Sequence, residues 1–177
     1  ASRFSYPSVR RTVKENAARL QGFVGAIDGD VVHLVGHSLG GLVIRQWLHD
    51  YPDQRPGRIV TLGTPHGGSH VARRLSRWPA GRVLLGRSLA HGLLGDLPAW
   101  DGALALGVIA GTLGMGMGWL VPGLERPNDG TVAAVETRLE GMTDYIELPV
   151  THTCMLFSRR AGAQVCAFLS TGRFARR

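Results

Sequence analysis

The chain alternates short apolar runs with stretches whose apolar residues recur every three or four positions. A continuous apolar run is typical of a strand buried on both faces, and the wider spacing is typical of an amphipathic helix. The runs predict strands over 31–35, 58–62, 106–110 and 145–148, and the wider spacing predicts helices over 8–27, 39–50 and 160–170. This alternation predicts an α/β fold, with a mostly parallel sheet covered by helices on both faces.

Two helix ends carry local signals. Ser8 is of a residue type favoured at the N-cap, so the first helix is expected to begin there. Gly172 is expected to end the last helix, because glycine readily adopts the left-handed conformation. A chain of 177 residues with 44% hydrophobic content can bury one substantial core, which predicts a single domain over 1–177.

Residues 69–101 break the regular pattern, because leucines and tryptophans are interspersed there with arginines. Two interpretations are open for this segment. It is either a cap or lid over an apolar pocket, in which Trp78, Leu85 and Leu94 contact substrate, or a pair of ordinary amphipathic helices packed on the sheet.

An almost uncharged stretch over 103–124 is long enough to suggest a membrane span. Its many glycines and Pro122 instead favour a short buried strand followed by an apolar loop. A span at this point would also divide the predicted sheet across a bilayer. We therefore expect a strand and a loop here.

The predicted strand 31–35 runs directly into Gly36-His37-Ser38-Leu39-Gly40-Gly41, and a helical pattern follows. A G-x-S-x-G turn between a strand and a helix holds its serine in a strained conformation, with Oγ projecting at the edge of the sheet. Ser38 is therefore the candidate nucleophile. The alternative is a tight glycine turn whose serine only caps the following helix.

A serine nucleophile requires a base and an acid. Asp129 lies in an Asn-Asp-Gly turn beyond the strand predicted over 106–110, and His152 follows the strand predicted over 145–148. The order serine, acid, histidine is that of α/β-hydrolases, so Asp129 and His152 complete the candidate triad. Taken alone, the Asn-Asp-Gly turn would more often be an ordinary loop.

The other histidines are weaker candidates, because a lone histidine more often has a structural hydrogen bond than a catalytic role. His37 lies inside the serine turn, and His66 lies in Thr64-Pro65-His66-Gly67-Gly68. Both are expected to line the substrate pocket without transferring a proton.

Together these motifs resemble the lipase and esterase branch of the α/β-hydrolases, including triacylglycerol-lipase-like and GPI-inositol-deacylase-like members. Beyond the serine turn, LGTPHGGS at 62–69 resembles the exit of the family's strand six, NDGTV at 128–132 its acid loop, and THT at 151–153 its histidine loop. The resemblance implies an α/β-hydrolase fold, with 69–101 at the position where the family commonly inserts a cap.

One part of the family pattern has no counterpart. The family supplies an oxyanion donor from a loop after strand three, often with a His-Gly stretch, well upstream of the nucleophile. Only 35 residues precede the serine turn, without such a stretch, so the fold is expected to be N-terminally shortened. The amide of Leu39 remains as one oxyanion donor, and loss of the second costs about 3 kcal/mol of transition-state stabilisation.

Charge and cysteines narrow the possible partners. The net charge is +7, but the arginines are scattered and no nucleic-acid-reading motif accompanies them, so we expect no nucleic-acid partner. The charge is compatible with peripheral contact with a membrane or lipid surface. Two cysteines without metal-type spacing predict no metal, no cofactor and no disulfide framework. No signal peptide is visible, and localisation and oligomeric state stay open.

The sequence thus predicts a serine hydrolase that cleaves small-molecule or lipid carboxylic esters through an acyl-enzyme. Thioesterase or acyltransferase chemistry would use the same triad. A catalytically impaired, lipid-binding protein or fragment is the alternative, because of the missing oxyanion loop.

Overall fold

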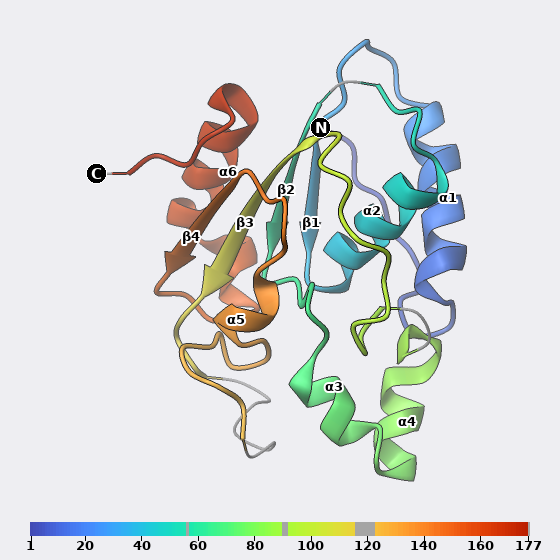
Figure 1. The fold of residues 1–177 in the computed structure, drawn as a ribbon, viewed down its shortest axis with the longest axis vertical. Helices are drawn as coiled ribbons and strands as arrows, with labels where there is room; N and C mark the ends of the chain where they lie inside the picture. Colours follow the sequence, from blue (N-terminus) through green and yellow to red (C-terminus); the bar gives the residue numbers. More distant parts are fainter. Residues whose placement is uncertain (56, 90–91, 116–122, 177) are drawn as a thin grey trace.

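Four parallel strands form the centre of the molecule. A computed structural model describes residues 1–55, 57–89, 92–115 and 123–176 (Figure 1). The strands are β1 (Leu34–His37), β2 (Arg58–Leu62), β3 (Ala105–Gly111) and β4 (Asp144–Leu148), and they pair in the order β1-β2-β3-β4. Parallel neighbours require crossovers, so the carboxyl ends of all four strands lie at one edge of the sheet.

Helices cover both faces of this sheet. α1 (Val13–Gly25) and α2 (Leu39–Asp50) lie on one face, and α6 (Arg159–Thr171) lies on the other (Figure 1). Neighbouring strand residues point to opposite faces, so Ile59 packs in the core beneath α1 and α2, whereas Val60 packs in the core beneath α6. The prediction of a parallel sheet covered on both faces is confirmed.

Most element boundaries match the sequence pattern. The predicted helix 39–50 and strand 58–62 have the predicted limits, and the strand and helix predicted over 106–110 and 160–170 are each one residue longer at both ends. The last helix ends at Gly172 with a φ of 80°, as its residue type predicts. β3 occupies the start of the apolar stretch 103–124, of which residues 116–122 lie outside the described residues.

The first helix begins later than predicted. Its N-cap is Thr12, whose hydroxyl accepts a hydrogen bond from the Glu15 backbone while the Glu15 carboxylate accepts one from the Thr12 backbone. This reciprocal pair satisfies two amides that a helix beginning at Val13 would otherwise leave unpaired, so the local hydrogen bonds decide the boundary.

The strand before the serine is also shifted, from 31–35 to Leu34–His37. The His33 ring takes the place of a ladder bond, because its Nδ1 accepts the Arg58 backbone N–H at 2.9 Å. β1 is an edge strand, and Val35 is 50% exposed, so the expectation of a strand buried on both faces is wrong here.

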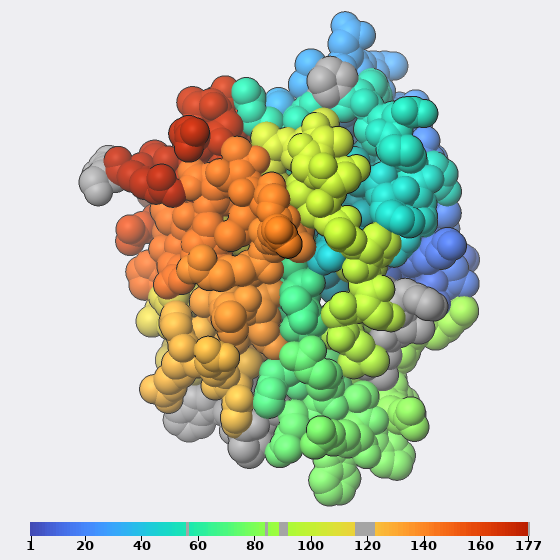
Figure 2. Space-filling model, viewed as in Figure 1, coloured from blue at the N-terminus to red at the C-terminus, as the bar shows by residue number. Residues whose placement is uncertain are grey.

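The segment after β2 lies beyond the carboxyl edge of the sheet. It contains α3 (His70–Leu75), α4 (Pro79–Leu85) and a 3-10 turn, η1 (Gly86–Leu89), which form the lower end of the molecule (Figures 1 and 2). α5 (Ala134–Thr137) and η3 (Cys154–Phe157) are short elements that the pattern did not predict. Cys154 and Cys166 are both free.

A glycine in β3 allows α6 to pack closely on the sheet. A Cβ on Gly107 would lie 2.7 Å from Cδ2 of Phe168 and 2.8 Å from Cζ of Phe174, which are two buried rings. We expect Gly107→Ala to lower the free energy of unfolding by about 1–3 kcal/mol through overpacking. Urea denaturation measures this change.

Gly162 in α6 provides the matched control. A Cβ there would meet no atom within 4 Å. Gly162→Ala should therefore be neutral or stabilise the chain by up to about 1 kcal/mol, because alanine is the better helix former. Equal effects of the two substitutions would contradict the packing described here.

Candidate active site

Ser38 lies at the junction of β1 and α2 in an unusual backbone conformation. It is the only described residue other than glycine with a positive φ, with φ 54° and ψ −125°. Such strain persists only where the surrounding structure enforces it. Gly36 shows how tight the turn is, because a Cβ there would lie 2.8 Å from the Gly41 nitrogen.

The Ser38 side chain does not cap the helix. Its backbone N–H donates to the Leu62 carbonyl at 2.9 Å, and its carbonyl accepts the Thr64 hydroxyl at 2.8 Å, but Oγ makes no cap bond. Among the described residues, Ser38 Oγ has no hydrogen-bond partner at all. The interpretation of Ser38 as a capping serine in a glycine turn is therefore wrong.

Asp129 and His152 form a buried pair. His152 Nδ1 donates to Asp129 Oδ2 at 2.7 Å, and the His152 backbone N–H donates to the Asp129 carbonyl at 2.9 Å. Asp129 is 1% exposed, and its Oδ1 accepts the backbone N–H groups of Thr131 and Val132. Because a carboxylate only accepts, the Nδ1 atom of His152 carries a proton and donates it to Asp129.

The carboxyl ends of the strands bring these residues together. Ser38 directly follows β1, Asp129 lies in the loop after β3, and His152 lies in the loop after β4. Gly63, directly after β2, shows how close the loops come, since a Cβ there would lie 2.9 Å from Asp129 Oδ2 and 3.0 Å from His152 Nδ1. Chemistry-bearing side chains thus gather at the carboxyl ends of parallel strands, where open α/β sheets place their sites.

His37 links the serine turn to the histidine loop. Its Nε2 lies 2.9 Å from the His152 carbonyl, and the two rings lie 4.7 Å apart. Burial, and next the neighbouring His152 ring, lower the pKa of His37, so it is neutral near pH 7 and donates from Nε2. His37 therefore holds the backbone of His152, which places it beside the candidate triad.

His66 is turned into the protein. It is 4% exposed, its Nε2 lies 3.1 Å from the Thr61 hydroxyl, and its carbonyl accepts the buried Arg45 guanidinium at 2.9 Å. Burial, and next the Arg45 charge, lower the pKa of His66 to about 3. This burial argues against the expected contact between His66 and substrate.

The amide of Leu39 is available at the start of α2. The first amides of a helix lack intrahelical acceptors, and the positive end of the helix dipole lies there. An anion beside Ser38 would face this end of α2. The oxyanion contact of Leu39, the residue at which α2 begins, stays a prediction.

The three apolar residues expected to contact substrate lie in the segment after β2. Trp78 directly precedes α4 and is 71% exposed, whereas Leu85 ends α4 and is half-buried. Leu94 is exposed and lies beside the loop after β2, since the Ser69 N–H donates to the neighbouring Leu93 carbonyl. Three other apolar residues of this segment, Leu93, Leu97 and Trp100, pack in the core with residues of α1 and α2, so both interpretations of 69–101 stay open.

Two charged residues that the sequence reasoning missed tie this site together. Arg45 donates to the carbonyls of His66, Leu97 and Pro98, which joins α2 to two loops. The Glu136 carboxylate accepts the backbone N–H groups of Ala133 and His70, which joins the acid loop to the loop after β2. Neither residue belongs to a motif, so only their tertiary contacts identify them.

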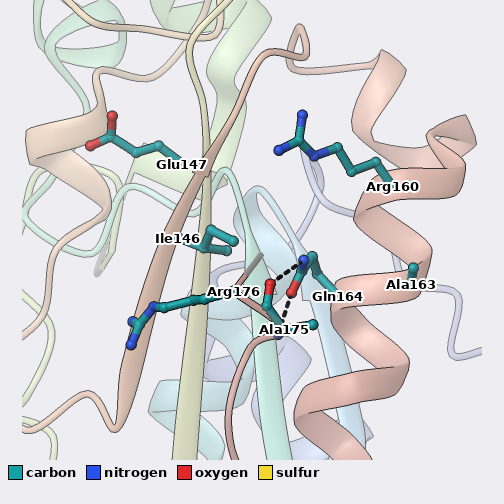
Figure 3. Close-up of a pocket in the computed structure, with 7 residues that line it drawn as sticks. All are labelled: Ile146, Glu147, Arg160, Ala163, Gln164, Ala175 and Arg176. Atoms are coloured by element: carbon teal, nitrogen blue, oxygen red, sulfur yellow. Dashed lines mark hydrogen bonds between the residues drawn. The ribbon is translucent and has the colours of Figure 1, made fainter.

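A groove beside β4, the outermost strand on the side of the sheet away from β1, does not contribute to this site. It lies between β4, α6 and the C-terminal segment, and Arg160 and Arg176 are among the residues that line it (Figure 3). The Gln164 amide forms two hydrogen bonds with the backbone of Ala175, each 2.9 Å long. The groove is therefore the seam along which the C-terminal segment docks on α6.

The fold is similar to that of several solved hydrolases. It matches the mature lipase BlEst2 of Bacillus licheniformis with a TM-score of 0.69 and 20% identity, over 91% of this chain and 74% of the lipase. The chain has the α/β-hydrolase fold. The propeptide form of that lipase matches with a TM-score of 0.74 and 20% identity, over 95% of this chain and 43% of the other.

A hydrolase from Pseudomonas aeruginosa also shares the fold, with a TM-score of 0.55 and 22% identity over 94% of this chain and 75% of the hydrolase. The metagenomic carboxyl esterase MGS0156 has a TM-score of 0.59 and 19% identity over 83% of this chain and 53% of the esterase. The chain thus spans between about two fifths and three quarters of these α/β-hydrolase structures. No protein-family model matches it.

Within the described parts of this α/β-hydrolase fold, no helix has the length and apolar character needed to cross a bilayer.

The buried His66 predicts a pH dependence of stability. The folded chain resists protonating His66 down to pH about 3, whereas the unfolded chain takes up this proton below pH about 6.5. The free energy of unfolding should therefore fall as the pH drops from 6.5 toward 3, with a slope of up to about 1.4 kcal/mol per pH unit from this residue. Urea denaturation at pH 4, 5 and 6 measures the slope.

His66→Gln should flatten this slope, although it lowers stability at pH 7 by disturbing the contact with Thr61. His49→Gln is the matched control, because the His49 side chain is 55% exposed, and it should keep the wild-type slope. An unchanged slope in His66→Gln would show that another group carries the dependence.

Proposed function

We propose that this chain is a serine hydrolase that cleaves carboxylic esters through an acyl-enzyme. The observation that carries the proposal is the 2.7 Å contact between His152 Nδ1 and Asp129 Oδ2, beside a serine with a strained backbone and a free hydroxyl. A histidine–aspartate pair with a purely structural role would not need a serine with an unpaired hydroxyl at the same ends of the strands.

We assign each residue a step. Ser38 Oγ attacks the ester carbonyl carbon while its proton passes to His152 Nε2. The carbonyl electron pair moves onto the oxygen, and the Leu39 N–H stabilises this oxyanion. Collapse of the tetrahedral intermediate expels the alcohol, which takes the proton from His152, and water then removes the acyl group by the same steps.

Asp129 stabilises the protonated ring of His152 during these steps. Its Oδ1 is already held by two backbone N–H groups, so the carboxylate stays fixed while Oδ2 faces the ring. His37 adds a second restraint by holding the His152 carbonyl. Hydrogen bonds to the ring and to the backbone carbonyl of His152 thus hold the base in place.

Within the hydrolase fold we place the chain in the lipase and esterase branch. The motifs at 62–69, 128–132 and 151–153 support this placement. Exposed apolar residues of 69–101 support a cap that holds an acyl chain and contacts lipid. We expect no nucleic-acid partner.

A second candidate function follows from the oxyanion site. The start of α2 offers the Leu39 amide, and Ser38 Oγ has no bond to His152 among the described residues. An impaired, lipid-binding protein would show this arrangement too. Thioesterase or acyltransferase chemistry would differ only in the leaving group or the acceptor.

Ser38→Ala tests the proposal. Wild-type chain should react with a fluorophosphonate probe and turn over p-nitrophenyl esters, and Ser38→Ala should lose both. Asp129→Asn should keep the fold but lower kcat by about 10⁴-fold, since the amide favours the wrong histidine tautomer. Ser170→Ala, an exposed serine in α6, is the control. Folded wild-type chain without labelling or turnover would favour the binding protein.

The cap proposal predicts a change in acyl-chain preference. Trp78→Ala and Leu94→Ala remove exposed apolar surface beside the site, so kcat/KM for octanoyl esters should fall about tenfold relative to acetyl esters. Leu156→Ala removes a similarly exposed side chain from η3, outside the segment 69–101, and should leave the ratio unchanged. An unchanged ratio in both cap variants would exclude the cap from substrate binding.

A further inference from the structure

The Leu39 amide belongs to the same peptide unit as the Ser38 carbonyl. A peptide unit is planar, and in its trans form the C=O and the N–H point in opposite directions. The bond between Ser38 and Leu39 is trans. Any group that holds the Ser38 carbonyl therefore also sets the direction of the Leu39 N–H.

Donors from two directions hold the Ser38 carbonyl. The Thr64 hydroxyl donates to it at 2.8 Å, and the Gly41 backbone N–H donates to it at 3.2 Å. A carbonyl oxygen has two lone pairs, so it can accept both bonds at once. The Gly41 bond ties the carbonyl to its own helix, whereas the shorter Thr64 bond ties it to the loop after β2.

The end of β2 also holds the other backbone polar group of Ser38. The Ser38 N–H donates to the carbonyl of Leu62, the last residue of β2, at 2.9 Å. The end of β2 and the loop after it thus contact Ser38 on both sides, through a backbone carbonyl on one side and the Thr64 hydroxyl on the other. Of these two contacts, substitution of a single side chain can remove only the second.

Packing fixes the Thr64 side chain. Thr64 is 0% exposed, and a Cβ on Gly41 would lie 2.2 Å from its Oγ1 and 2.7 Å from its Cγ2. The loop itself is tied to α2, because the His66 carbonyl accepts the Arg45 guanidinium at 2.9 Å. The hydroxyl is therefore held in place, and turning the Ser38 carbonyl away from it would break a buried hydrogen bond.

The amide end of this peptide unit is unpaired. No described residue accepts the Leu39 N–H, and the neighbouring Ser38 Oγ has no partner among the described residues either. Linked hydrogen bonds polarise one another, so a bond to the Ser38 carbonyl makes the Leu39 N–H a stronger donor. The Thr64 hydroxyl thus both orients and polarises this amide.

We propose that Thr64 is a positioning residue for the oxyanion site, because its hydroxyl holds the Ser38 carbonyl and thereby directs the Leu39 N–H. When Ser38 Oγ bonds to the ester carbon, the carbonyl electron pair moves to the oxygen, and the Leu39 N–H donates to that oxygen. The serine proton passes to His152 and leaves with the alcohol. Thr64 is fully buried, so it acts through the peptide unit and not by touching substrate. This inference rests on the proposed esterase function.

Thr64→Val tests the proposal, because valine keeps the shape of the side chain and removes the hydroxyl. We expect kcat for p-nitrophenyl esters to fall about tenfold, less than the hundredfold or more that follows outright loss of an oxyanion donor. KM should stay within about twofold, because the bond strengthens only as charge develops on the oxygen. Each kcat is normalised to the fraction of Ser38 that a fluorophosphonate probe finally labels, so unfolded molecules do not count.

Thr64→Ser separates the hydroxyl from the packing. Serine keeps the hydroxyl and loses the methyl group, so this variant should retain at least about half of the wild-type kcat. If Thr64 only filled space beside Gly41, the order would reverse, and valine would be the milder substitution. A kcat of Thr64→Ser at or below that of Thr64→Val would therefore overturn the proposal. Should Thr64→Val fail to fold, a loss of about tenfold or more in Thr64→Ser would overturn it alone.

A trifluoromethyl ketone inhibitor gives an independent readout, because Ser38 adds to its carbonyl and forms a tetrahedral adduct that carries an oxyanion. Its inhibition constant should rise about tenfold in Thr64→Val, in parallel with the fall in kcat/KM. An unchanged inhibition constant beside a lower kcat would overturn the role at the oxyanion.

Thr137→Val is the matched control. Thr137 is 1% exposed, and its hydroxyl also donates to a backbone carbonyl, that of Ala134 at 2.7 Å, but within α5 instead of the serine turn. It should keep the wild-type kcat and inhibition constant. An active wild type with a Thr64→Val kcat within about twofold would overturn the role of Thr64 and leave the esterase proposal standing. A wild type that neither labels nor turns over would remove both proposals.

Discussion

The positive φ of Ser38 is the constraint on which the rest of the site depends. The backbone of a serine is strained in this conformation. Contacts with the surrounding residues hold it there. The turn passes so close to α2 that only glycine fits at 36, and Gly41 makes room for Thr64, whose hydroxyl holds the Ser38 carbonyl. The result is a serine side chain that makes no cap bond and has no hydrogen-bond partner among the described residues.

The parallel sheet then determines which residues meet this serine. All four strands end at one edge, so the loops after β1, β3 and β4 converge although their residues are far apart in sequence. Arg45 and Glu136 fix the surrounding loops through backbone groups. Neutral His66 adjoins Arg45, because a second positive charge buried there would be costly.

The strand that leads into the serine turn has different neighbours on its two sides. Among the described residues β1 pairs only with β2, and a groove lined by Gly36, His37 and Gly40 follows the other side of β1. The aromatic packing of Phe4 and Tyr6 carries a phenol to this side. Structural similarity at about 20% identity establishes the fold but not this local arrangement, which belongs to the residues before α1.

The sequence by itself determined the sheet, its covering helices and the three residues of the candidate triad. Those predictions rest on local properties: apolar spacing, glycine turns and the order of motifs. Tertiary structure decided what local patterns do not encode. It moved the start of α1 to the Thr12 cap, made β1 an edge strand, turned His66 inward and brought Tyr6 to Gly40. Burial and long-range contact are properties of the packed chain, because they depend on which distant segments share a face of the sheet.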